Sequence, residues 1–272
     1  MVLERWRGFI RAWRDYPLPG GAVIGGRYKI DLLLGEGSYG LTYRCYDTRD
    51  GALLALKQSR PSKQALGRTM LAKESAILQA MDHPNIPKCR DYFNYKGSNW
   101  LVTDYITGQT LEDLIFDEHV IYGERECLAM ALRLMNMVTH VHSRGYVHLD
   151  LRIPNVILHK EDLYLIDFGL AEKIGETDTV LERLKPRKES WPERRPPVIG
   201  SDLYDVGQLM LFMLYSGYQP ERGGPERSWQ EELELSPGML LLLTRLLGEQ
   251  ECYPDSASFV REAGELYEQL MS

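Results

Sequence analysis

The chain has 272 residues and a formal net charge of −7, which leaves room for one large domain or two small lobes. An acidic chain lacks the broad basic surface that nucleic-acid backbones require, so no nucleic-acid partner is expected. The four cysteines show no metal-ligand spacing, no apolar run reaches the roughly 18 residues of a membrane span, and no signal-peptide core is found. We therefore expect a cytoplasmic protein with reduced cysteines and no transmembrane segment.

Residues 1–16 carry apolar side chains at helical spacing on one face, with arginines largely off that face. A basic amphipathic helix of this kind can contact a partner or a membrane surface, or it can pack on the domain behind it. Packing is favoured, because a helix this short is marginal unless its apolar face is covered. Residues 17–26 contain two prolines and four glycines and are predicted to be a linker, so residues 1–27 form an N-terminal region of helix and linker.

Residues 28–106 are rich in β-forming side chains separated by glycine turns. Strands are predicted at 28–30, 41–43, 53–56 and 100–102, with one helix around 69–81. From residue 107 onward, apolar residues recur at three- and four-residue spacing. Helices are predicted there at 111–115, 124–144, 202–215, 239–247 and 256–270. This order predicts an α+β fold of two lobes: an antiparallel β-sheet with one helix (about 28–106), then a mainly helical lobe (about 107–272).

A glycine-rich turn lies between two predicted strands, at Gly35-Glu36-Gly37-Ser38-Tyr39-Gly40. Glycines let the backbone approach a phosphate closely and offer amide groups as donors. A dinucleotide-binding motif would need a helix next, whereas residues 41–46 continue as a strand. The segment therefore favours a hairpin that covers phosphates.

A lysine and a glutamate follow this turn. Lys57 ends an apolar strand, and Glu74 lies in the predicted helix. Either residue alone is more often a solvated surface charge. As a pair downstream of a glycine hairpin, they indicate a phosphate contact that is fixed by a carboxylate.

The later part of the chain carries polar residues suited to phosphoryl transfer. His148-Leu149-Asp150-Leu151-Arg152-Ile153-Pro154-Asn155 precedes a short apolar strand, and Asp167-Phe168-Gly169 follows another. Phosphoryl transfer needs a base that orients a hydroxyl, and oxygen ligands for magnesium. Asp150 can be the base, while Asn155 and Asp167 can hold the metal. An ordinary turn could contain any one of them, but it does not explain their ordered spacing.

Together these segments resemble the eukaryotic-type protein kinases, which also occur in bacteria, over about residues 28–272. The resemblance implies ATP and Mg²⁺ as cofactors, a Lys57–Glu74 ion pair and Asp150 as the catalytic base. Arg152 stands where most serine/threonine kinases carry a lysine that steadies the γ-phosphate. Asn155 and Asp167 would bind Mg²⁺, and Asp202 would brace the catalytic loop.

The resemblance also implies a set of nucleotide-binding residues in the glycine-rich hairpin, the lysine strand, the hinge and one later strand. This set is Leu34, Gly35, Glu36, Gly37, Ser38, Tyr39, Gly40, Leu41, Thr42, Ala55, Lys57, Glu74, Thr103, Asp104, Ile106 and Ile157. Thr103 would be a small gatekeeper, and the backbone of Asp104 and Ile106 would meet the adenine.

The sequence departs from the family before the catalytic base. Leu149 stands where many members carry an arginine that pairs with a phosphorylated activation loop. Leucine cannot make that charge-assisted contact. Activity is therefore predicted not to depend on phosphorylation of Thr177, Thr179 or Ser190.

Two further family segments are altered. No clear Ala-Pro-Glu follows residue 169, although 191–193 reads Trp-Pro-Glu, and the expected Arg-Pro-Ser segment reads Tyr-Pro-Asp-Ser at 253–256. In the family, Glu and Arg of these segments form a buried ion pair, so losing both predicts a rebuilt peptide-docking platform. Residues 181–195 hold six basic and three acidic residues, which indicates either a site for an acidic partner or a solvated loop.

The predicted activity is ATP- and Mg²⁺-dependent phosphoryl transfer to a protein substrate, on Ser or Thr rather than Tyr. A nucleotide-binding pseudokinase scaffold is an alternative that the altered activation segment favours. Retention of Lys57, Glu74, Asp150, Asn155 and Asp167 argues against it. Because the peptide-docking platform is predicted to be rebuilt, a kinase that acts on a small molecule is a second alternative.

Overall fold

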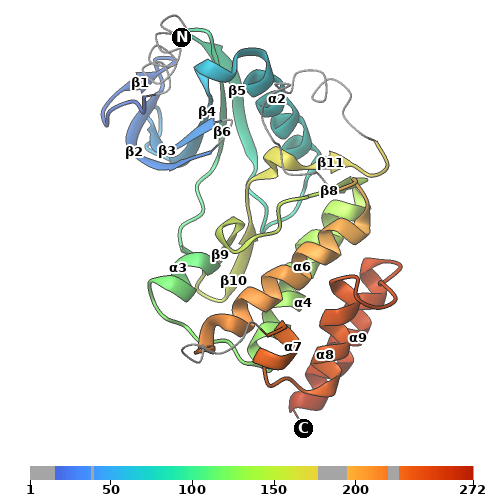
Figure 1. Cartoon of the computed structure of the whole chain (residues 1–272). Coiled ribbons are helices and arrows are strands. Elements are labelled where there is room, and N and C mark those ends of the chain that lie inside the picture. The colour runs from blue at the N-terminus through green and yellow to red at the C-terminus, as the bar shows by residue number, and fades with distance from the viewer. Residues whose placement is uncertain (1–15, 38–39, 177–194, 220–226, 272) are drawn as a thin grey trace, which may run out of the picture. The chain divides into compact units, whose positions relative to one another are not determined.

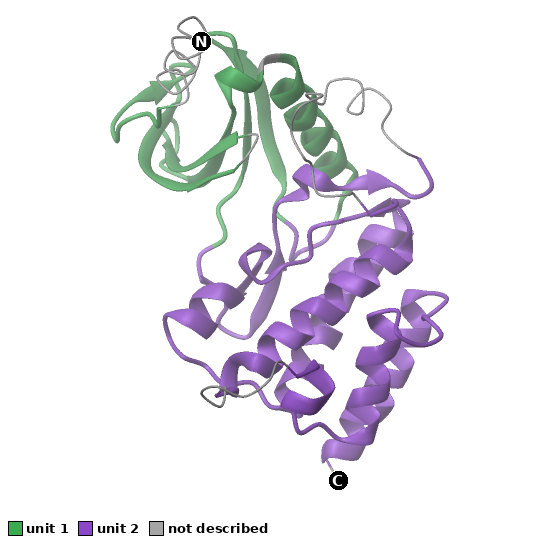
Figure 2. Cartoon of the chain, viewed as in Figure 1, with its two compact units in different colours: residues 1–82, 87–106, 178–192 green, residues 83–86, 107–177, 193–272 purple. Residues whose placement is uncertain are grey.

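The computed structural model describes residues 16–37, 40–176, 195–219 and 227–271. Two compact units divide them: residues 16–82 and 87–106 belong to one, and residues 83–86 and 107–271 to the other, apart from the gaps just given (Figure 2). The predicted helix at 1–16 lies outside the described residues except for its last position. So do Ser38, Tyr39, the candidate phosphorylation sites and all of 181–195 except Arg195.

The first unit contains an antiparallel sheet and one long helix (Figure 1). The strand order is β1-β2-β3-β4-β6-β5. The bounds are β1 Val23–Ile24, β2 Tyr28–Glu36, β3 Gly40–Asp47, β4 Leu53–Ser59, β5 Cys89–Tyr95 and β6 Ser98–Asp104, with helix α2 at Gln64–Ala80. Alternate residues of the strands face the core, where Tyr43, Leu56 and Trp100 are buried.

Part of the stretch predicted to be a linker is packed on this sheet. Strand β1 pairs with the start of β2, and the Gly21 amide donates to the Ile30 carbonyl at 2.8 Å. Leu18 and Ala22 contact the core of the sheet. The prediction of a linker is wrong for these residues, because the two glycines after β1, both at positive φ, let the chain reverse and pair with β2.

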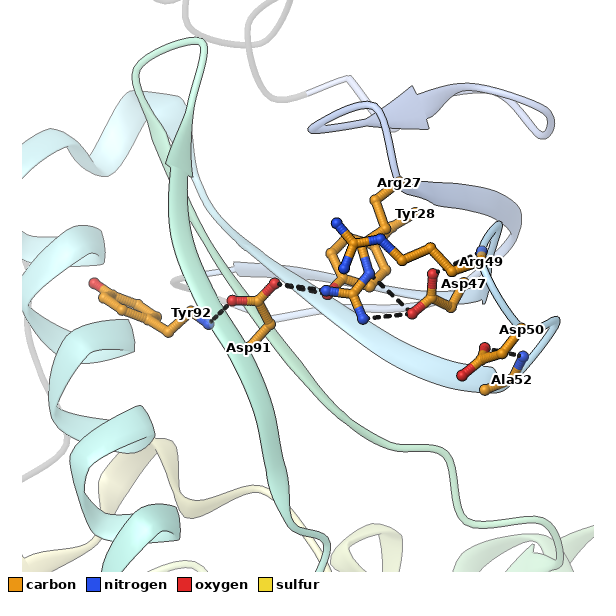
Figure 3. A network of polar contacts seen from close by, with 8 residues as sticks. All are labelled: Arg27, Tyr28, Asp47, Arg49, Asp50, Ala52, Asp91 and Tyr92. Carbon is orange, nitrogen blue, oxygen red and sulfur yellow. Dashed lines mark hydrogen bonds and ion pairs between the residues drawn. The ribbon is translucent and has the colours of Figure 1, made fainter.

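A polar network ties three strands of the first unit together (Figure 3). Arg27 donates to Asp47 from Nε and Nη2, at 2.9 and 2.6 Å, which holds the pKa of Asp47 below its usual value. The Tyr28 hydroxyl donates to Asp91 at 2.7 Å, and Arg27 lies 3.5 Å from the same carboxylate. Tyr28 begins β2, Asp47 ends β3 and Asp91 lies in β5, while Arg27 directly precedes β2. The network therefore connects strands that are distant in sequence.

The second unit is mainly helical. Its helices are α3 Leu111–Phe116, α4 Glu124–Ser143, α6 Ile199–Leu214, α7 Trp229–Glu232, α8 Pro237–Leu246 and α9 Ser256–Met271. Helix α4 contacts both α6 and α9 and contributes a buried apolar face to the core. None of the helices within the described ranges combines the length and apolar character that crossing a membrane requires.

Short strands of the second unit carry the segments that the sequence singles out. A three-stranded sheet has the order β10-β9-β7, with β7 at Gln109–Thr110, β9 at Val156–His159 and β10 at Asp162–Leu165. Strand β8 at Tyr146–Val147 pairs with β11 at Glu172–Lys173. The predicted catalytic loop therefore runs from β8 to β9, and the Asp-Phe-Gly segment runs from β10 to β11. The predicted α+β composition is confirmed.

Candidate active site

The lysine and glutamate of the first unit form the ion pair that the resemblance implies. Lys57 lies in β4 and Glu74 in α2, and Nζ is 2.9 and 2.8 Å from the two carboxylate oxygens. Glu74 is buried. Because Nζ contacts both oxygens of this buried carboxylate, the pair fixes the lysine side chain.

The glycine-rich segment is a hairpin, as predicted, because β2 ends at Glu36 and β3 begins at Gly40. The Gly37 amide donates to the Gly40 carbonyl at 2.9 Å, and Arg60 donates to the Gly37 carbonyl at 2.7 Å. A Cβ atom at position 40 would lie 2.9 Å from the Gln58 carbonyl oxygen. Glycine is therefore required there for β3 to lie against β4.

The remaining nucleotide-binding candidates of the first unit differ in how accessible they are. Leu41 is 1% exposed and belongs to the core of the sheet, so its side chain is not available to a ligand. Thr42, the next residue, points to the opposite face and pairs with Lys57. Leu34 is exposed on β2, and Ala55 pairs with Thr103 across β4 and β6.

The hinge candidate Asp104 has a defined set of partners. Its amide donates to the Lys88 carbonyl at 3.2 Å, and its carboxylate accepts from the Lys88 amide at 3.0 Å and pairs with Arg90. The Thr103 hydroxyl donates to the Asp104 carbonyl at 3.3 Å. A carbonyl oxygen has two lone pairs, so it retains capacity for one more donor.

The predicted catalytic base lies in a polar cradle of the second unit. The Asp150 carboxylate pairs with Arg152, with Nε at 2.6 Å and Nη2 at 3.0 Å, and it accepts from Nδ2 of Asn155 at 2.8 Å. These contacts raise the pKa of Arg152, chiefly through the hydrogen bond to Asp150 and with help from the charge of Asp167. The three predicted residues are thus brought together with a fixed carboxylate orientation.

The two predicted metal ligands have oxygen atoms suited to magnesium. Asn155 uses its amide nitrogen on the carbonyl and carboxylate of Asp150, at 2.9 and 2.8 Å, so its amide oxygen is the atom that could bind the ion. One oxygen of Asp167 accepts from the Gly169 amide at 3.1 Å. Magnesium commonly uses one or two protein oxygens together with substrate phosphates, so this donor set fits the ion. Within the described ranges, no cluster of three or more His, Cys, Asp or Glu side chains could hold a metal by itself.

Asp202 fixes the backbone of the catalytic loop through hydrogen bonds, as the resemblance implies. It is 0% exposed and accepts from the His148 amide, the Leu149 amide and Nε2 of His142, each at 2.8 Å. Leu149 has a φ of +61°. A leucine rarely adopts this left-handed conformation, so the hydrogen bond to Asp202 stabilises a strained residue directly before the base.

His148 links the catalytic loop to the Asp-Phe-Gly segment. Its Nε2 lies 3.2 Å from the Ile166 carbonyl, and its ring makes an edge contact with Phe168 at 4.7 Å between centroids. Burial lowers the pKa of His148. The ring is therefore neutral at pH 7, with the proton on Nε2, because the Ile166 carbonyl can only accept.

The sequence reasoning assigned no individual role to Arg195 or Asp205. They form an ion pair of 2.5 Å in the second unit. The sequence signal for Asp205 was that this aspartate lies among the apolar residues of the buried face of α6. Ile157, the nucleotide-binding candidate of the second unit, lies in β9 and is nearly buried.

Comparisons with known proteins agree with this arrangement. The sequence matches the family described as protein kinase domain over residues 28–222. It is 35% identical over 250 residues to the probable serine/threonine-protein kinase YbdM of Bacillus subtilis, with 91% of this chain and 92% of that protein covered. It is 27% identical over 202 residues to smooth muscle myosin light chain kinase of Gallus gallus, covering 72% of this chain and 10% of that protein.

The fold is similar to that of a solved bacterial kinase domain. The structure of the PknI kinase domain of Mycobacterium tuberculosis matches with a TM-score of 0.69 at 19% sequence identity, covering 92% of this chain and 99% of that chain. This likeness confirms the predicted fold class. The chain therefore belongs to the protein kinase family, among kinases of the bacterial serine/threonine type.

Proposed function

We propose that this protein kinase transfers the γ-phosphoryl group of MgATP to a serine or threonine hydroxyl of a protein, with Asp150 as the base. The cradle around Asp150 supports this most directly. Arg152 and Asn155 contact both carboxylate oxygens and so restrict the orientation of the side chain. A fixed carboxylate can orient the substrate hydroxyl and take its proton as the oxygen attacks.

The other residues have supporting roles in the proposed reaction. Lys57, fixed by Glu74, places a positive charge on the nucleotide phosphates. Asn155 and Asp167 would hold magnesium, which neutralises charge on the transferred phosphoryl group. Arg152 contacts Asp150 and adds a cation near the transferred group. The preference for Ser and Thr is supported by the similarity to the Bacillus subtilis protein YbdM, a probable serine/threonine-protein kinase.

Radiolabelled ATP tests the proposal. The wild-type chain should transfer label to protein, and phosphoamino-acid analysis should find phosphoserine or phosphothreonine. Asp150→Asn should lower the rate by about 100-fold or more, because general-base catalysis contributes roughly that much. Binding of a non-hydrolysable ATP analogue, followed by calorimetry, should be retained in the variant.

Other outcomes identify the alternatives. Nucleotide binding without transfer by the wild-type chain would favour the pseudokinase scaffold. Label found on a soluble metabolite instead of protein would favour a small-molecule kinase. Equal transfer by wild type and Asp150→Asn would exclude Asp150 as the base.

A further inference from the structure

The ion pair between Arg195 and Asp205 joins an accessible residue to a buried one. Nη1 of Arg195 lies 2.5 Å from Oδ1 of Asp205, and the side chains are 44% and 8% exposed. The guanidinium group also stacks over the Tyr204 ring, 4.3 Å from its centroid. It donates in addition to the Ser201 carbonyl at 3.3 Å. Arg195 is therefore held on α6 by three kinds of contact.

The residues after Arg195 are fixed as well. The Ser201 hydroxyl donates to the Pro196 carbonyl at 2.7 Å, and the Ser201 amide donates to the Val198 carbonyl at 2.9 Å. The Gly175 amide donates to the Pro197 carbonyl at 2.8 Å. Because Gly175 follows β11, this short stretch is attached both to α6 and to the chain that leaves the Asp-Phe-Gly segment.

On its other side, Asp205 faces the catalytic loop. The backbone of Leu151, the residue directly after the proposed base, lowers the pKa of Asp205. The charge of Asp205 also contributes to the raised pKa of Arg152. Asp205 thus pairs with Arg195, at the end of the activation segment that follows Asp167-Phe168-Gly169, and it interacts electrostatically with the catalytic loop. The same helix, α6, contacts that loop through Asp202, which accepts from the His148 and Leu149 amides.

A purely stabilising role does not fit the electrostatics of Asp205. Burial and the charge of Asp202 raise its pKa, Arg195 and the Leu151 backbone lower it, and the net result is a pKa of about 6. Arg152 is the other cation nearby. An ionised carboxylate in such a place opposes folding at neutral pH, which is typical of groups that are kept for the chemistry of a site.

We propose that Arg195 and Asp205 are positioning residues that hold the end of the activation segment against the catalytic loop, so that a protein substrate meets Asp150 correctly. The inference rests on the proposed function. It supplies a phosphorylation-independent link in a chain that has Leu149 instead of a phosphate-binding arginine. The link would act on the protein substrate, because Arg195 ends the activation segment and Asp205 lies beside the loop that carries Asp150.

Variants of the pair test this, with dephosphorylated casein and the chain itself as substrates. Arg195→Gln, Asp205→Asn and the double variant should each lower kcat/KM for protein phosphorylation by about tenfold, in the range of measured couplings between contacting residues. The double variant should be no worse than the single ones. The Kd of a non-hydrolysable ATP analogue should stay unchanged. Phosphatase treatment of the wild type should not alter its activity.

Arg245→Gln provides a matched control in the same unit. Arg245 also pairs with a carboxylate, Glu262, and stacks over a tyrosine, Tyr253, at 4.0 Å. This variant should lose stability but keep kcat/KM below its melting temperature. An equal loss of kcat/KM in the control would overturn the proposal, since the effect would then reflect stability.

The pH profile gives a second readout. Protonation of Asp205 near pH 6 should weaken the link, so wild-type kcat/KM should fall in that range. In Arg195→Gln the fall should move toward neutral pH, and in Asp205→Asn that step should disappear. If the wild-type chain phosphorylates protein and the variants of the pair do so equally well, the inference is rejected and the proposed function stands. If the wild-type chain is inactive, the proposed function itself is rejected.

Discussion

At the scale of single residues, the candidate active site contains strained backbone. Leu149 and Asp167 have φ values of +61° and +60°. Aspartate tolerates this region because its side chain can bond locally, as Asp167 does with the Gly169 amide, whereas leucine has no such option. Such strain costs on the order of 1–3 kcal/mol per residue and persists only where the surroundings fix it. At Leu149 the fixing group is the buried carboxylate of Asp202.

The pKa of Asp205 leads to a prediction about stability. Its folded value, about 6, lies above its ordinary 3.8, so between these values the folded chain binds a proton that the unfolded chain does not. The free energy of unfolding should therefore decrease as the pH rises from about 4 to about 6, and this contribution should be fully lost above that range. Asp205→Asn removes this loss and should be more stable than wild type at pH 7.5 by up to about 3 kcal/mol, at 1.36 kcal/mol per unit of pKa.

Urea unfolding of both proteins at pH 7.5 and pH 4.5 measures this effect. The advantage of Asp205→Asn should shrink at the lower pH, where the wild-type carboxyl is protonated. A variant that is less stable than wild type at pH 7.5 would contradict the assignment. We expect Asp205→Asn to be more stable than wild type but less active. This combination would show that Asp205 positions other groups and does not mainly stabilise the fold.

Residue chemistry that follows from motif spacing was predictable from the sequence, and the partners supplied by tertiary packing were not. The pairing of Lys57 with Glu74 was expected from the resemblance and is present. Asp205 could not be assigned, because its partner Arg195 lies ten positions away with no motif to connect them. The burial of Leu41 could not be predicted from the sequence either, because the side of a strand that faces the core depends on the pairing register.

At the scale of elements, strongly periodic helices were predicted well and short or polar elements were missed. Helix α4 was predicted at 124–144 and spans Glu124–Ser143. Strand β5 was missed, because its sequence CRDYFNY lacks clean alternation and its formation depends on pairing with β6. The four-residue helix α7 is too short for periodicity to reveal, and its capping box at Ser228 was the available signal.

The contact between α6 and α8 depends on a glycine. A Cβ atom at Gly207 would lie 2.8 Å from Cβ of Leu246 and 3.2 Å from Cδ2 of Leu247. Gly207→Ala should lower the free energy of unfolding by about 1–2 kcal/mol, because overpacking costs more than the helix propensity gained. Gly264→Ala in α9 is the matched control, since nothing lies within 4 Å of the added atom.

Thermal unfolding monitored by circular dichroism would compare the two alanine variants. The control should be equal to wild type or more stable by up to about 1 kcal/mol. If both variants melted at the same temperature, α6 and α8 would not be in the close contact that Gly207 permits.

At the scale of the whole molecule, each unit carries its own set of groups for the proposed reaction (Figure 2). The first unit contributes Lys57, Glu74 and the glycine hairpin. The second contributes Asp150, Asn155 and Asp167. Composition and the order of elements predicted this division, because strands dominate the first part of the chain and helices the second.

Under the proposed function, binding of MgATP should stabilise the chain. A non-hydrolysable ATP analogue with Mg²⁺, at about 100 times its Kd, should add roughly 2.7 kcal/mol of stability. That corresponds to a rise in Tm of roughly 5–10 °C for a chain of this size. EDTA should remove most of the rise, because in the proposed function Asn155 and Asp167 would hold the nucleotide through the metal.

Substitutions in either unit should weaken this thermal shift. Lys57→Met and Asp167→Asn should each reduce it, whereas Arg125→Gln, which breaks an exposed ion pair on α4, should leave it intact. A full shift in Lys57→Met would show that the lysine does not contribute to nucleotide binding.

The short strand β1 has a consequence for the behaviour of the chain in solution. An uncovered strand edge offers unpaired amide and carbonyl groups to other molecules and favours aggregation. Residues 21–24 occupy the start of the β2 edge, and a two-residue outer strand is itself too short to recruit a neighbour. A fragment trimmed to residue 28, where the family match begins, would uncover that edge and should self-associate more readily than the longer chain.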